Sequence, residues 1–259
     1  MIGKRDEGAA RAARRRGPAD PLVREVGYLE LLQALERPGC AVCNAADRAA
    51  RRYLDALLWE FVNDPGVRDR LRSSLGFCGA HTALAVEVAA EQAGGLGMAI
   101  LYEDFLRHAR VAAERAARLL AAAPSRRRRE AALNGLRPDV GCPACEAAAR
   151  AARNGARLLS LAGEESRLGR AARQEGRGVC IPHLALGLEE AGGPEEAERL
   201  MEVFRRGVDE VAGDLLEHIR KHDYRHADEP PGREADVWRR APWWVVGRPG
   251  TASYGRPAP

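Results

Sequence analysis

The chain has 259 residues, enough for one large domain or two small ones with a substantial core. Alanine, leucine and arginine dominate and only 5% of the residues are aromatic, which argues against a sheet-based fold and indicates the all-α class. The formal net charge is +4, and residues 1–19 hold six basic and two acidic side chains, so the remainder is neutral overall. A nucleic-acid partner is therefore disfavoured, because it would call for a basic stripe on the folded part.

The sequence predicts a cytoplasmic protein. Its N-terminus is positively charged but has no apolar stretch behind it, which argues against a secretory signal. A membrane span needs about 18 consecutive apolar residues, and the sequence contains no such run. Because cytosolic thiols are kept reduced, the six cysteines are expected to be ligands or reactive groups and not disulfides.

Residues 1–19 are expected to form a disordered basic tail, because they offer almost nothing large to bury. Residues 20–123 are expected to form a first helical repeat, since apolar residues recur there at helical spacing. Its helices are predicted over residues 21–36, 41–62, 67–74, 78–92 and 98–123.

A linker is predicted over residues 124–141, and its basic block from Arg126 to Arg129 is expected to be a solvated run of charge. A second helical repeat follows over residues 142–226, with helices predicted over 144–162, 164–174, 182–190 and 195–224. Residues 227–259 form a tail rich in proline, glycine and tryptophan, with one possible amphipathic piece over 233–238.

Two sets of cysteines and histidine share one spacing. The first set is Cys40, Cys43, Cys78 and His81. Each member recurs 102 positions later, so that 40, 43, 78 and 81 correspond to 142, 145, 180 and 183. Flanking residues repeat at the same offset, which indicates an internal duplication of a four-helix unit. The second set consists of Cys142, Cys145, Cys180 and His183.

Each set has the donors of a closed zinc site. Two cysteines three positions apart at the start of a helix can direct both sulfurs at one point, and a Cys-x-x-His pair can do the same from a second element. Together they make a Cys3His tetrahedron, the type found in structural zinc sites, and helix N-termini beside the pairs would stabilise the thiolates. The sequence thus predicts two zinc ions, one per repeat. Ligands exchanged between the repeats would fit the spacing equally well.

An iron–sulfur cluster is the alternative cofactor, because thiolate-rich sites also hold such clusters. A thiol–disulfide role for the C-x-x-C pairs is less favoured, since no βαβ pattern accompanies them. If the cysteines were only small buried hydrophobes, the recurring histidine would have no explanation.

The stretches "GCAVC…YLDALLWEFVNDPGVRDRL…GFCGAH", "GCPAC…GVCIPH" and "HIRKHDYRHADEP" resemble a bacterial family of helical proteins of unknown function. Those proteins carry paired C-P-x-C and C-x-x-H motifs, and the resemblance covers roughly residues 22–240. Ala41 stands where proline is usual, whereas Pro143 keeps the pattern. The resemblance implies a helical fold and metal ligands at the two sets, and it implies no activity.

Two further features lie in the C-terminal quarter. His218, His222 and His226 are spaced so that neighbouring pairs share a helix face, as two metal ligands would, but a polar helix end is the simpler interpretation. Trp238, Trp243 and Trp244 are expected to dock on the body, with partner binding as the alternative.

Three hypotheses of function follow. The leading one is a non-enzymatic interaction or scaffold protein with two structural zinc sites, whose basic and tryptophan-containing tails contact an unknown protein partner. The second is an iron–sulfur or thiol redox protein. The third is a metal-dependent enzyme that uses His218 and His222, although no catalytic motif is found.

Overall fold

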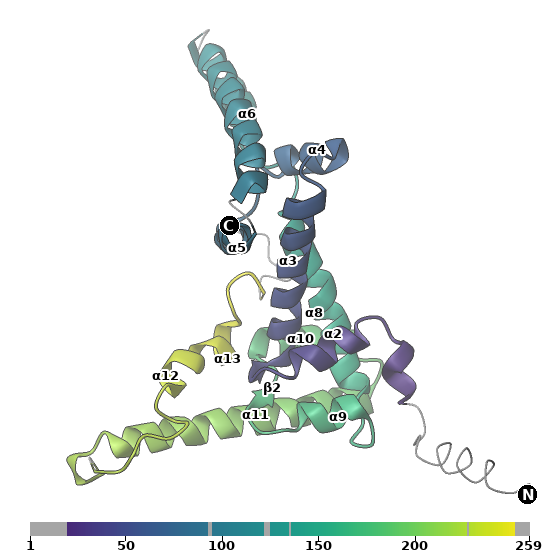
Figure 1. Ribbon diagram of the computed structural model, residues 1–259, viewed down its shortest axis with the longest axis vertical. Helices are drawn as coiled ribbons and strands as arrows, with labels where there is room; N and C mark the ends of the chain where they lie inside the picture. Colours follow the sequence, from purple (N-terminus) through teal and green to yellow (C-terminus); the bar gives the residue numbers. More distant parts are fainter. Residues whose placement is uncertain (1–19, 93–94, 122–124, 135, 227, 252–259) are drawn as a thin grey trace, which may run out of the picture.

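The computed structural model describes residues 20–92, 95–121, 125–134, 136–226 and 228–251 (Figure 1). Within these residues the regular secondary structure is helical apart from one pair of two-residue strands, which confirms the all-α class. The predicted disordered tail, residues 1–19, lies outside the described residues. None of the described helices combines the length and hydropathy that a membrane span requires.

The first half has the predicted order of helices with shifted ends. The helix expected over 21–36 is two elements, because Gly27 interrupts it with a left-handed φ of +89°. Asp64 caps the fourth helix as its position before proline suggests, since its carboxylate accepts the Val67 N–H at 2.8 Å. The elements are η1 (Pro21–Arg24), α2 (Tyr28–Ala34), β1 (Gly39–Cys40), α3 (Ala41–Glu60), α4 (Pro65–Ser73), α5 (Gly79–Glu91) and α6 (Leu96–Ala121).

The stretch predicted as a linker contains a helix, α7 (Arg126–Asn134), which packs on α6 and buries Ala132. Alanine and leucine after the four arginines favour this helix. The remaining elements are α8 (Pro143–Leu161), α9 (Arg167–Ala172), β2 (Arg177–Gly178), α10 (Ile181–Glu190), α11 (Pro194–Lys221), η3 (Tyr224–His226), α12 (Val237–Arg240) and α13 (Pro242–Val246).

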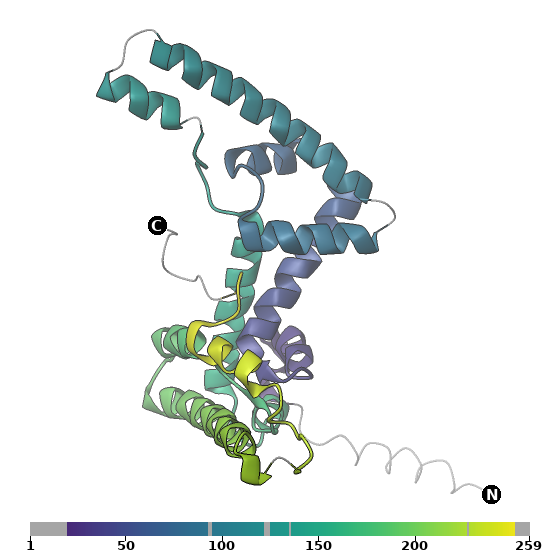
Figure 2. The same ribbon diagram turned by 90° about the vertical axis from the view of Figure 1, so that its left-hand side faces the viewer.

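The long helices α3 and α8 lie side by side at the centre of the molecule (Figures 1 and 2). They run antiparallel, because Gly155 late in α8 lies against Val42 and Ala45 at the start of α3. The start of α8, at Ala144, belongs to the same hydrophobic cluster as Leu54, late in α3. Small buried side chains line this contact, so the two helices can approach closely. They include Ala45, Ala46, Ala50, Ala148, Ala152 and Ala156.

Two hydrophobic clusters lie along this central pair. One joins α2, the start of α3 and the later part of α8 to α9, α10 and α11. The other joins the later part of α3 and the start of α8 to α4, α5 and α6. Each cluster therefore contains elements from both halves of the sequence.

The outer part of α6 projects from the body with α7 beside it (Figure 2). At its base the carboxylate of Asp104, which is buried, accepts two hydrogen bonds from Arg72 of α4, at 2.9 and 3.0 Å. These bonds from Arg72 hold the pKa of Asp104 below its ordinary value.

Replacing Asp104 with asparagine is expected to destabilise the protein at pH 7, since Arg72 loses its anionic partner. The pKa of Asp104 is lower in the folded than in the unfolded protein, where it is near 3.8. The extra free energy of unfolding of the wild type is therefore fully present above pH 3.8 and is lost as the pH falls through the pKa of the folded state. Urea unfolding at pH 7 and pH 3 measures this difference. A gap between the two proteins that does not shrink on acidification would contradict the assignment.

The C-terminal segment docks on the body through Trp244, which is 7% exposed. Its ring fills the space left by Gly178 and Gly207, where an added Cβ would lie 2.6 and 2.5 Å from a ring carbon. Trp238 and Trp243 remain 54% and 41% exposed. The expected docking of the tryptophan tail is therefore confirmed for one of its three tryptophans.

Candidate metal centres

Four cysteines begin four helices. Cys40, Cys78, Cys142 and Cys180 are the N-cap residues of α3, α5, α8 and α10, each with extended backbone. The free N–H groups and the positive end of the dipole at a helix N-terminus favour a thiolate there. At Cys40 one contact is direct, because the Cys43 N–H donates to its sulfur at 3.4 Å.

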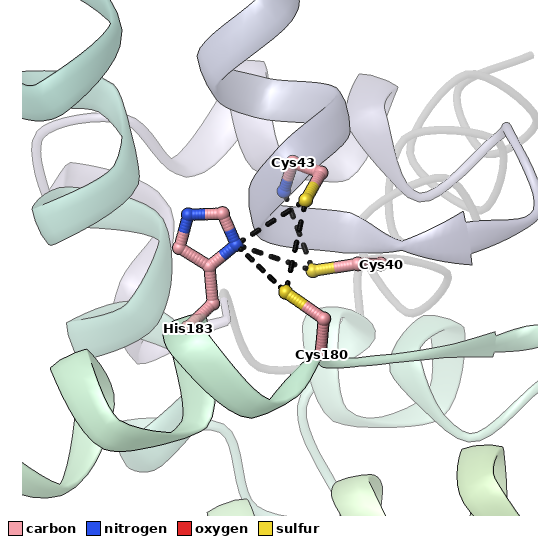
Figure 3. A group of neighbouring side chains, drawn as sticks. All are labelled: Cys40, Cys43, Cys180 and His183. Carbon is pink, nitrogen blue, oxygen red and sulfur yellow. Dashed lines mark hydrogen bonds between the residues drawn. The ribbon is translucent and has the colours of Figure 1, made fainter. Parts of the chain in front are cut away.

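The first centre, called site 1, consists of Cys40, Cys43, Cys180 and His183. Parallel pairing of β1 with β2 brings the two cysteine loops together, with Cys40 opposite Gly178. Figure 3 shows the three sulfurs and the imidazole Nδ1 turned toward one point. All four residues are buried, and none is more than 7% exposed.

The distances in site 1 fit a tetrahedral ion. With Zn–S of about 2.3 Å and Zn–N of about 2.0 Å, tetrahedral angles require about 3.8 Å between sulfurs and about 3.5 Å between sulfur and nitrogen. Cys43 Sγ and Cys180 Sγ lie 3.8 Å apart. His183 Nδ1 lies 3.5, 3.3 and 3.2 Å from the sulfurs of Cys40, Cys43 and Cys180.

The imidazole of His183 is oriented by the C-terminal strap, which we define as residues 247–251. The Nε2 atom of His183 lies 3.0 Å from the carbonyl oxygen of Thr251. A carbonyl only accepts, so Nε2 carries the proton and Nδ1 presents its lone pair to the sulfurs. Such a bond on the far ring nitrogen is the usual support for a metal-binding histidine.

The strap is held to α3 by Arg248. Its guanidinium donates to Asn44 Oδ1 at 2.8 Å and to Asp47 Oδ2 at 2.9 Å. The Asn44 amide group in turn donates to the carbonyls of Ala34, Arg37 and Pro38, just before Cys40. One polar network thus supports both the cysteine loop and the histidine of site 1. A cavity of about 760 Å³ lies beside this network, under the C-terminal segment.

The second centre, site 2, consists of Cys78, His81, Cys142 and Cys145. Cys78 Sγ and Cys145 Sγ lie 3.6 Å apart. His81 Nδ1 lies 3.3, 3.7 and 3.2 Å from the sulfurs of Cys78, Cys142 and Cys145. His81 is buried, but the three cysteines are only partly buried. Site 2 has the geometry of site 1 with more exposure.

Burial and mutual hydrogen bonds drive the pKa values of the site 1 thiols apart. Hydrogen bonds from Cys180 and Cys40 hold the pKa of Cys43 far below its ordinary value. Burial, followed by the neighbouring cysteines, raises the pKa of Cys40 well above it. The hydrogen bond to Cys40 lowers the pKa of Cys180, but the bond to Cys43 and burial outweigh it and raise that pKa to about 12.

Site 2 shows the same divergence. Hydrogen bonds from Cys142 and Cys145 lower the pKa of Cys78 far below its ordinary value, whereas bonds to Cys142 and Cys78 raise that of Cys145. Burial lowers the pKa of His81, but its bonds to Cys142 and Cys78 outweigh this and raise it to about 9. A divalent cation would displace these protons, so its affinity must rise with pH.

The expectation that each repeat holds its own quartet is wrong. Each centre takes its C-x-x-C pair from one half and its C-x-x-H pair from the other. The reason is the central helix pair: each pair of ligands begins a helix, and the 20 residues of α3 span about 30 Å. Antiparallel packing places the start of each long helix beside the other half's C-x-x-H loop.

The histidines at the end of α11 form no comparable centre among the described residues. The rings of His218 and His222 lie 4.3 Å apart, and His222 Nδ1 donates to the His218 carbonyl at 2.8 Å. His226 lies instead in a network with Arg220 and Glu229. The described groups of three or more cysteine, histidine or carboxylate ligands are sites 1 and 2.

Sequence reasoning missed the outer support of site 1. A backbone carbonyl such as that of Thr251 leaves no signature in the sequence. Asn44 and Arg248 stand 204 positions apart and lie outside the repeated motifs. Only the proximity of Asn44 to Cys43 offered a signal, since asparagine early in a helix commonly bonds to nearby backbone.

Comparison with known proteins identifies a relative that is itself uncharacterized. The chain is 35% identical over 77 residues to the "Uncharacterized 23.9 kDa protein in xynA 3'region" of Caldicellulosiruptor sp. (strain Rt8B.4). The match covers 30% of this chain and 36% of that protein. No family model matches the chain, and no solved structure matches it. The resemblance to a bacterial family of paired motifs therefore stays a prediction.

Proposed function

We propose that the protein is a non-enzymatic interaction or scaffold protein whose two halves are held together by two structural zinc ions. The observation that carries the proposal is the closed donor set of each centre: three cysteines and one histidine converge on one point. Four protein ligands fill the tetrahedron and leave no position for a substrate, as in structural zinc sites, whereas catalytic zinc sites keep one position open. The ion of site 1 would join α3 of the first half to α10 of the second, and the ion of site 2 would join α5 to α8.

Zinc suits these donors better than magnesium or calcium does. Thiolate and imidazole ligands in tetrahedral geometry favour zinc or an iron–sulfur cluster over magnesium or calcium. The sulfur–sulfur distances of 3.6 and 3.8 Å fit one ion within each centre. A reducing cytoplasm, where thiols stay available, suits this chemistry.

The halves are proposed to descend from one duplicated unit. Helices α3, α4 and α5 begin at residues 41, 65 and 79, and α8, α9 and α10 begin at 143, 167 and 181, an offset of 102 in each case. For contact with a protein partner, Trp238 and Trp243 are the candidates, since half-exposed tryptophans are common anchors at interfaces.

Metal analysis with a visible absorption spectrum of anaerobically purified protein tests the proposal. We expect about two zinc ions per chain and no visible colour. A brown protein that contains iron and sulfide would indicate an iron–sulfur cluster in place of zinc. Protein without metal at neutral pH that also gains no stability on addition of zinc would refute the metal centres.

A further inference from the structure

The two centres have the same donors but differ in access. The three sulfurs of site 1 belong to residues that are at most 7% exposed. The three cysteines of site 2 are all partly exposed. Oxidants react with the thiolates they can reach, and a zinc-bound thiolate keeps nucleophilic character.

The histidines of both centres are buried, and both lie near the strap, since an added Cβ at Gly250 would be 3.3 Å from His81 Nε2. His183 is fully buried and is bonded to the strap through Thr251. A cavity of about 190 Å³ borders site 2 and is lined by His81, Asp47 and Glu87 and by strap residues 249–251. The cavity of about 760 Å³ described above borders Cys40 and Cys43 of site 1. The two centres therefore differ in the exposure of their cysteines and not in the presence of a neighbouring cavity.

One sulfur pair of site 2 is placed for disulfide formation. Cys78 Sγ and Cys145 Sγ lie 3.6 Å apart, and a disulfide needs about 2.05 Å. Cys78 precedes α5 and Cys145 lies in the first turn of α8, so the bond would link the same two helices that the metal links.

We propose that site 2 is a redox-modifiable centre, in which a two-electron oxidant such as hydrogen peroxide converts Cys78 and Cys145 to a disulfide and releases the metal, while site 1 keeps its ion. This inference rests on the proposed zinc sites.

The reaction balances with peroxide as the oxidant. One thiolate attacks the O–O bond, which gives a sulfenic acid and hydroxide. The second thiolate attacks the sulfenic sulfur, so that an S–S bond forms, an S–O bond breaks and a second hydroxide leaves. The two sulfurs together lose two electrons and the peroxide gains them. Cys142 and His81 alone then hold the ion too weakly to retain it.

The test treats full-length, zinc-loaded protein with increasing hydrogen peroxide in the presence of a chromogenic zinc chelator. We expect release of about half of the bound zinc, a Cys78–Cys145 disulfide by mass spectrometry after alkylation, and Cys40, Cys43 and Cys180 alkylated only after denaturation. Dithiothreitol with added zinc should restore the second ion. Cys78→Ser should abolish the disulfide, whereas Ala45→Ser, which removes no ligand, should leave it intact.

Release of both ions at the same rate, earlier release from site 1, or a disulfide between Cys142 and Cys145 would overturn the inference. The zinc content before oxidation separates this outcome from failure of the underlying proposal. A count of two ions with no selectivity rejects only the redox centre, whereas a count of zero rejects the zinc sites.

Discussion

Replacing Cys43 by serine is expected to remove one of two zinc ions and to cause a large loss of stability. Cys43 is fully buried, and its sulfur lies within 3.8 Å of both Cys180 and His183. A ligand that binds only the folded state stabilises it by about 4 kcal/mol when its free concentration is about 1,000 times Kd. Loss of site 1 should therefore lower the free energy of unfolding by about that amount, measured by urea denaturation with buffered zinc.

Ala45→Ser is the matched control for this variant. Ala45 is buried in the same turn of α3 and is not a ligand, so its replacement buries a hydroxyl without removing a donor. It should keep both ions and cost about 1–3 kcal/mol. If Cys43→Ser retained two zinc ions or lost no more stability than Ala45→Ser, site 1 would not be a metal centre.

Removing residues 249–259, so that the chain ends at Arg248, is expected to weaken zinc binding at site 1. The expected loss of affinity is about 10- to 100-fold, the usual effect of losing the hydrogen-bond partner of a metal ligand. The shorter chain keeps Arg248 and its bonds to α3 but lacks the carbonyl that holds His183 Nε2 at 3.0 Å. The bond that fixes the ring orientation and keeps the proton on Nε2 is then lost.

The effect is measured by competition with a chelator in a Cys78→Ser background, where site 1 alone is complete. A chain that ends at Ala252 is the matched control, because it retains the peptide carbonyl of Thr251 and differs from the shorter chain by four residues. Equal zinc affinity in the two chains would show that the strap does not orient the histidine. A loss in both chains relative to the full-length protein would place the support beyond residue 252.

The donors of the centres could be predicted from the sequence because their spacing is local. A cysteine at an N-cap and a second cysteine or histidine three positions later face the same point, whatever the rest of the fold does. Four repeats of this arrangement, at Cys40, Cys78, Cys142 and Cys180, therefore stood out. The helical class followed equally well from composition and apolar periodicity.

The partner of each pair could not be predicted in this way. A fixed offset of 102 residues is compatible with both pairings, so the choice depends on how α3 packs against α8. That packing rests on buried alanines such as Ala46 and Ala152, which read in sequence as ordinary helix formers. The strap was missed for a different reason, since Thr251 acts through its backbone and Arg248 through a contact distant in sequence.

Zinc content of two double variants tests the exchange of ligands between the halves most directly. Cys43→Ser with Cys180→Ser removes two ligands of one centre, and Cys43→Ser with Cys78→Ser removes one ligand from each. After dialysis against a competing chelator, the first variant is predicted to retain one zinc ion per chain and the second to retain none. The reverse result, one ion in the second variant and none in the first, would show that each half holds its own ion and would contradict the account.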